Sequence, residues 1–122
     1  ILLQEMGRYD EAVASYAKAL ALEPNHYDAV TNLSLTYLAL GRYEEAADRL
    51  GMLLDVEPDD AITCYNLACV YSRSDRIPDA LHWLREAVKR GFEDWDTLAG
   101  DPDLTNLRAS PDFVDAGLPP AP

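Results

Sequence analysis

The sequence predicts an all-α fold: an α-solenoid of antiparallel helix pairs with 34-residue repeats, closed by short C-terminal capping helices. The first observation is a repeated phrase, which reads GRYDEA at 7–12, GRYEEA at 41–46 and DRIPDA at 75–80. The second is that apolar residues within each period recur at i, i+4, i+7 and i+8, the spacing of one helix face. A fixed period of this size is typical of solenoids, whose units bury their apolar faces against their neighbours.

The first of three related helices is expected over 9–22, and the pattern of its inward face recurs in each later period. Because Ile1 falls inside a helical pattern, we expect the chain to be a fragment of a longer array. The inward positions of the three related helices are Ala12, Tyr16, Ala19 and Leu20, then Ala46, Leu50, Leu53 and Leu54, then Ala80, Leu84, Ala87 and Val88.

Two further helices are expected between these, at about 27–40 and 61–74, so that each period holds two helices. Their inward residues are Val30, Leu33 and Tyr37 in the first, and Cys64, Leu67 and Tyr71 in the second.

Turn residues stand where the helices must end. Gly41, and less readily Asp75, can adopt the positive φ that closes a helix. Proline disfavours helical geometry in the residue before it, and a polar residue after it can cap the next helix. The prolines are Pro24 and Pro58, and the candidate caps are Asn25, Asp59 and Asp60.

These residues together resemble the tetratricopeptide repeat family. The resemblance rests on the 34-residue period, the Asn-Leu-small triplets at 32–34 and 66–68, the turn glycines, the recurring alanines and the closing prolines. It covers about residues 1–94 and implies a partial first repeat, two complete repeats, a cap and a short tail expected to be disordered. The predicted boundaries are 1–26, 27–60, 61–94, 95–117 and 118–122.

The segment 95–117, called the cap below, follows a different pattern from the repeats. Asp101-Pro102-Asp103 and Ser110-Pro111-Asp112 each read as an N-cap, a proline in the first helical position and an acid in the first turn. Two short helices should therefore start there. The apolar residues expected to cover the exposed end of the last repeat are Trp95, Leu98, Leu104, Leu107 and Phe113.

Composition excludes several classes of partner. Ten basic residues stand against 22 acidic ones, a net charge of -12, which argues against nucleic acid and against an anionic membrane surface. No apolar run approaches the roughly 18 to 20 residues of a spanning helix, so direct membrane insertion is not expected.

The two cysteines indicate a reducing environment. Cys64 and Cys69 lie on one predicted helix and point about 140° apart, so they cannot bridge. We expect both to be ordinary helix residues, with a reactive Cys69 as the alternative, and a cytoplasmic or another reducing soluble compartment.

No residue pattern predicts catalysis. His26 and His82 lie 56 positions apart, and the acid pairs at 10–11 and 44–45 fall in first helical turns, where they meet the helix dipole favourably. The acidic run from Asp94 has Ala99 where a calcium loop requires glycine. We therefore expect no enzyme activity, no metal site and no cofactor.

The outward face of the first helices of the second and third repeats is the candidate binding surface. The resemblance implies that this side is concave, that it holds an extended peptide or a partner helix, and that Asn32 and Asn66 hydrogen-bond the ligand backbone. The alternative is that the two asparagines only satisfy a neighbouring helix. The predicted groove residues are Asp28, Thr31, Asn32, Leu35, Leu38, Ala39, Ile62, Tyr65, Asn66, Cys69, Ser72 and Arg73.

The family's carboxylate clamp for chaperone termini is not expected, because Arg73 is the only cation among the groove residues. A protein or peptide that is basic, or mixed apolar and basic, fits the charge better. The predicted function is a non-enzymatic protein-protein interaction scaffold, acting in the assembly of a larger complex. Alternatives left open are a regulatory or tethering module of a larger enzyme whose catalytic part lies upstream, and self-association.

Overall fold

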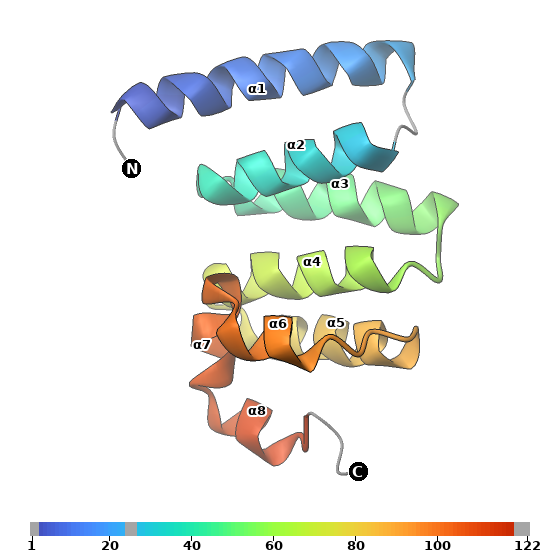
Figure 1. The fold of residues 1–122 in the computed structure, drawn as a ribbon, viewed down its shortest axis with the longest axis vertical. Coiled ribbons are helices and arrows are strands. Elements are labelled where there is room, and N and C mark those ends of the chain that lie inside the picture. The colour runs from blue at the N-terminus through green and yellow to red at the C-terminus, as the bar shows by residue number, and fades with distance from the viewer. Residues whose placement is uncertain (1–2, 24–26, 119–122) are drawn as a thin grey trace. The chain divides into compact units, whose positions relative to one another are not determined.

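The computed structural model describes residues 3–23 and 27–118, and within those ranges it is helical with no strand (Figure 1). The helices Tyr27–Ala39 and Tyr43–Val56 pack against each other, as do Ala61–Arg73 and Ile77–Lys89, which confirms the predicted all-α class of helix pairs. Pro24, Asn25, His26 and most of the 118–122 tail lie outside the described residues. None of the described helices has the length and apolar content that a membrane crossing requires.

The chain divides after Pro58 into two compact units, described separately below. The first contains α1 (Leu3–Leu22), α2 (Tyr27–Ala39) and α3 (Tyr43–Val56). The second contains α4 (Ala61–Arg73), α5 (Ile77–Lys89), α6 (Trp95–Gly100), the 3-10 helix η1 (Pro102–Leu104), α7 (Thr105–Arg108) and α8 (Pro111–Asp115).

The core of the first unit lies around α2, which contacts both α1 and α3. Leu33, Ala46 and Leu50 are fully buried there, as their predicted inward positions require. Leu38 corrects the sequence interpretation, because it was assigned to the groove and is only 2% exposed. A helix with a neighbour on each of two sides buries a wider face than the single stripe assumed from the spacing.

The turns at Gly41 and Asp75 adopt the predicted left-handed conformation, with φ of 76° and 60°. Gly91, which follows the C-cap residue Arg90 of α5, has φ of 105°. Gly7 differs, because α1 runs through it from Leu3, whereas the helix was expected to start at residue 9. Glycine tolerates either conformation, so the repeated phrase alone does not impose a turn at this position.

Each of these two turns contains the same contact between an arginine and a tyrosine. The backbone N–H of Arg42 donates to the Tyr37 carbonyl at 2.8 Å, and Arg76 does the same to Tyr71 at 2.8 Å. In each pair the guanidinium lies over the ring, 4.6 Å and 4.9 Å from its centroid. A cation over an aromatic face is attracted to it, so this contact favours the same turn geometry at both positions.

The predicted helix starts in the second unit are confirmed. The side chains of Asp60, Asp101 and Ser110 each accept a hydrogen bond from the backbone N–H two residues on, at 3.0, 2.9 and 3.2 Å. These bonds begin α4, η1 and α8 respectively, and satisfy N–H groups that a helix start leaves without partners.

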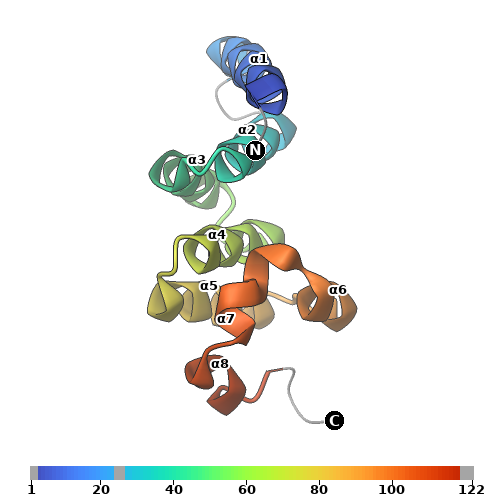
Figure 2. The ribbon, with the colours of Figure 1, turned by 90° about the vertical axis from the view of Figure 1, so that its left-hand side faces the viewer.

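The cap of the second unit forms part of its core. Leu98, Leu104 and Leu107 are at most 2% exposed, while Trp95 and Phe113 are half-buried. Figure 2 shows α7 lying beside α4 and α5, so the cap contacts both helices of the last pair and does not cover only its end.

Candidate functional site

The part of the predicted groove that lies on α2 is open. Asp28, Asn32 and Leu35 are exposed, Leu35 by 39%, and Thr31 is half-buried. These four residues are called the α2 face below. Ala39 is half-buried at the end of the same helix.

Two polar groups on the α2 face have no partner among the described residues. The buried Oγ1 of Thr31 makes no hydrogen bond there. The side-chain amide of Asn32 makes none either, although its backbone carbonyl accepts a bond from Thr36 Oγ1 at 2.8 Å. The face therefore presents one exposed amide and one exposed apolar side chain, above a buried hydroxyl that has no partner among the described residues.

The part of the predicted groove that lies on α4 is covered by the chain's own cap. Tyr65 and Cys69 are 6% and 3% exposed. The Tyr65 hydroxyl donates to Asp101 Oδ2 at 2.6 Å, and the Cys69 thiol lies 3.9 Å from the same oxygen. Arg73 Nη1 pairs with Asp103 Oδ1 at 3.3 Å. Ile62 stays exposed and Asn66 half-buried on this helix.

Ser72 ties α7 to the same helix. Its hydroxyl oxygen accepts a hydrogen bond from the backbone N–H of Leu107 at 3.1 Å, and its carbonyl accepts one from Asn106 Nδ2 at 3.1 Å. Ser72 is fully buried and so is the bond to its hydroxyl, whereas the bond from the exposed Asn106 is only part-buried. The cap is thus held on α4 by hydrogen bonds as well as by its leucines.

Aromatic ring contacts lie beside the hydrogen bond between Tyr65 and Asp101. The rings of Tyr65 and Phe92 are stacked with centroids 4.5 Å apart, and Phe92 meets Trp95 edge-on at 6.1 Å. Pairs of this kind add stability beyond the area that they bury. They fix the Tyr65 ring with its hydroxyl toward Asp101.

The chemistry under the cap suits carboxylate binding and not nucleophilic catalysis. Burial raises the pKa of the Tyr65 phenol, and its hydrogen bond to Asp101 raises it further. Burial also raises the pKa of the Cys69 thiol, as does the negative charge of Asp101, so neither group ionises near neutral pH. This opposes the alternative of a reactive Cys69.

Cys69, Asp101 and Asp103 place one ligand atom each within 4.8 Å of one another, a spacing compatible with a metal ion. The two carboxylates already have partners within the chain, because Asp101 accepts from Tyr65 and from the Asp103 N–H, and Asp103 Oδ1 pairs with Arg73. Asp101 and Asp103 are therefore surrounded by hydrogen-bond donors that bind carboxylates, namely the Tyr65 hydroxyl, a backbone N–H and the Arg73 guanidinium.

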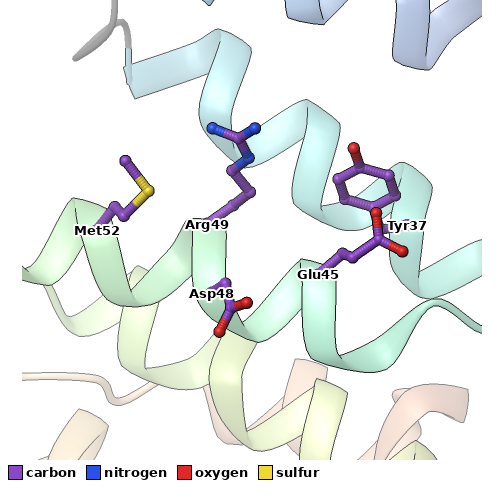
Figure 3. A pocket seen from close by; sticks show the side chains of 5 residues that line it. All are labelled: Tyr37, Glu45, Asp48, Arg49 and Met52. Carbon is purple, nitrogen blue, oxygen red and sulfur yellow. The ribbon is translucent and has the colours of Figure 1, made fainter.

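A surface hollow of about 300 Å³ lies between α2 and α3 in the first unit (Figure 3). Its lining mixes charges, and Glu45 is already paired with Arg42, whose Nε and Nη2 lie 2.8 and 2.5 Å from its carboxylate. The sequence did not predict this hollow. Its lining residues are Tyr37, Glu45, Asp48, Arg49 and Met52.

Sequence reasoning missed the contact between the cap and α4. Arg73 is the only cation among the predicted groove residues, and the segment that reaches it carries Asp101 and Asp103. That charge complementarity was the available signal. It does not by itself tell an internal acidic partner from an external one.

Comparisons with known proteins match the chain to one family. Two models described as tetratricopeptide repeat match residues 3–63 and 61–91. A stretch of 43 residues is 44% identical to part of a chloroplastic protein of Arabidopsis thaliana. That match takes in 35% of this chain and 13% of the plant protein, so the chain spans only a small share of this relative.

Proposed function

Because the chain belongs to the tetratricopeptide repeat family, whose repeats generally mediate protein-protein interaction, we propose that it is a non-enzymatic module that binds a segment of a partner protein on the α2 face. The segment is an extended peptide or one side of a helix. The amide of Asn32 holds its backbone, and Leu35 contacts one of its apolar side chains.

The observation that supports this proposal is the difference between two equivalent helix faces. Thr31 and Leu35 on α2 lie 34 residues before Tyr65 and Cys69 on α4. The α4 positions are buried under the cap, whereas Leu35 is 39% exposed and the Thr31 hydroxyl has no partner among the described residues. A ligand would supply on α2 the contacts that the cap makes on α4.

The partner segment is expected to be basic or mixed apolar and basic. The only charged residue of the α2 face is Asp28, and the whole chain carries a net charge of -12. Complementary charge raises the association rate more than the affinity. A steep loss of association rate with added salt would accompany such a partner.

The experiment begins with a peptide selected from a random display library against the whole chain, and measures its affinity by calorimetry. The double change Asn32→Ala and Leu35→Ala should weaken binding by about 1 to 3 kcal/mol, from one lost hydrogen bond and one lost apolar contact. Val114→Ala is the matched control, since Val114 is 71% exposed in α8.

Circular dichroism of the double variant should be unchanged, because both side chains are exposed. Binding that survives the double change and is lost on charge reversal of Asp48 and Asp55 would refute the proposal. It would move the site to α3, on which both acids are exposed.

A further inference from the structure

The turn Asp101-Pro102-Asp103-Leu104 lies on α4 with the features of a bound ligand. Asp101 accepts from the Tyr65 hydroxyl, Asp103 pairs with Arg73, and Leu104 is fully buried. The pairs that make these contacts are 30 to 36 residues apart, so they do not arise from local chain geometry.

The turn is organised by its own bonds before it meets α4. Asp101 Oδ1 accepts from the Asp103 N–H at 2.9 Å, which leaves Oδ2 for Tyr65. Arg108 Nη1 donates to the carbonyls of Leu98 at 2.9 Å and Asp101 at 2.6 Å from the cap side. A segment with this preformed shape loses little conformational freedom on docking.

We propose that the face of α4 formed by Tyr65, Cys69, Ser72 and Arg73 is a binding site for an acidic Asp-Pro-Asp-Leu turn, which the cap occupies in the resting chain and a partner protein's turn of the same chemistry occupies when the cap is released. This site is separate from the α2 face and selects the opposite charge. Its ligand is acidic, whereas the α2 face suits a basic one.

Because the cap is part of the same chain as α4, its release controls whether an external acidic turn can bind. A tethered segment has an effective concentration in the millimolar range, so a free acidic turn competes poorly with the intact cap. Its apparent affinity falls by the fraction of molecules whose cap is open. Changes that weaken the cap should therefore strengthen binding of an external turn.

Cys69 is a natural reporter of the cap. The residue is 3% exposed and its thiol lies 3.9 Å from Asp101 Oδ2, so an alkylating reagent reaches it when the cap opens. Cys64 is fully buried on the same helix, burial raises the pKa of its thiol, and the charges that act on it include those of Glu86 in α5 and Arg90 at its end. Its rate of alkylation therefore reports global unfolding and serves as the control.

The first measurement compares alkylation rates of the two cysteines, resolved by peptide mass spectrometry, in the whole chain. The double change Asp101→Asn and Asp103→Lys should speed modification of Cys69 about tenfold or more, since it removes charge-assisted bonds and opposes Arg73 with like charge. Cys64 should keep its rate. An unchanged rate at Cys69 would overturn the proposal.

Tyr65→Phe is a milder second variant, used if the double change unfolds the unit and Cys64 speeds up equally. It removes one hydroxyl and keeps the ring that stacks on Phe92. Faster alkylation of Cys69 alone is again the expected result. Equal rates at Cys69 in this variant and the wild type would show that the Tyr65–Asp101 bond does not hold the cap.

The second measurement adds a blocked synthetic peptide with the sequence of residues 99–109 to the double variant. The peptide should slow Cys69 alkylation several-fold at millimolar concentration, while a peptide with asparagine at both aspartates should not. When Arg73→Glu is combined with the double variant, the peptide should no longer slow alkylation of Cys69. No protection, or equal protection by the asparagine peptide, would overturn the site whatever the fate of the α2 face.

Discussion

Gly51 in α3 offers a direct test of the helix assignment in the first unit, through Gly51→Ala. Gly51 is an interior position of Tyr43–Val56, and a Cβ added there meets no heavy atom within 4 Å. Glycine costs about 1 kcal/mol relative to alanine in a helix interior, because it loses more backbone freedom on folding. The variant should therefore be more stable by about 0.5 to 1 kcal/mol.

Gly41→Ala is the matched control, because it adds the same methyl group to equally open space. A Cβ at Gly41 also meets nothing within 4 Å, but the residue has φ of 76°. Alanine in the left-handed region costs roughly 1 to 2 kcal/mol. The two substitutions should thus change the free energy of unfolding in opposite directions.

The assay is urea unfolding followed by far-UV circular dichroism. With a slope of about 1 to 3 kcal/mol per molar, the Gly51 variant should raise the midpoint by roughly 0.2 to 1 M, and the Gly41 variant should lower it. Fluorescence of Trp83 and Trp95 reports on the second unit alone. A lowered midpoint for Gly51→Ala would refute both the helical conformation and the open space assigned to it.

Two other predictions concern the core and the cap. Leu33→Ala should destabilise the chain by about 2 to 5 kcal/mol in the same urea assay, since Leu33 is fully buried, while Leu35→Ala on the same helix should change stability by no more than about 0.5 kcal/mol. Hydrogen bonds from the hydroxyl and N–H of Thr97 hold the pKa of Asp94 below its ordinary value of 3.8, so the stability that they contribute is complete above that pH and is lost as the pH falls through the lowered value. An acid titration of α6 amide exchange should show this loss and Asp94→Asn should not, and identical titrations would contradict it.

Local sequence features account for most of the helix boundaries. Asp60 was one of two acids proposed to cap α4, and its side chain accepts from the N–H groups of Ile62 and Thr63. Asp75 was expected to replace Gly41 at the turn, and it has positive φ. Each of these features depends on bonds within a few residues, so the order of residue types is enough to predict it.

The burial of individual groove residues was harder to predict, because it depends on how many neighbours a helix has. Leu38 was placed outside the core by its spacing, and it is 2% exposed on a helix that contacts both α1 and α3. Tyr65 and Cys69 were placed on an open face that the cap covers. The partner, the ligand backbone contacts and the repeat boundaries stay predictions.

The Asp101 carboxylate separates what the sequence determined from what the tertiary structure decided. Its Oδ1 accepts from the Asp103 N–H at 2.9 Å, a bond within three residues that the Asp-Pro-Asp motif predicts. Its Oδ2 accepts from Tyr65 at 2.6 Å, across 36 residues. Tyr65 and Asp101 come together only when Leu104 and Leu107 pack on the last helix pair, where both leucines are fully buried. Burial of apolar side chains is not directional, so no local motif specifies which distant helix face the two leucines cover.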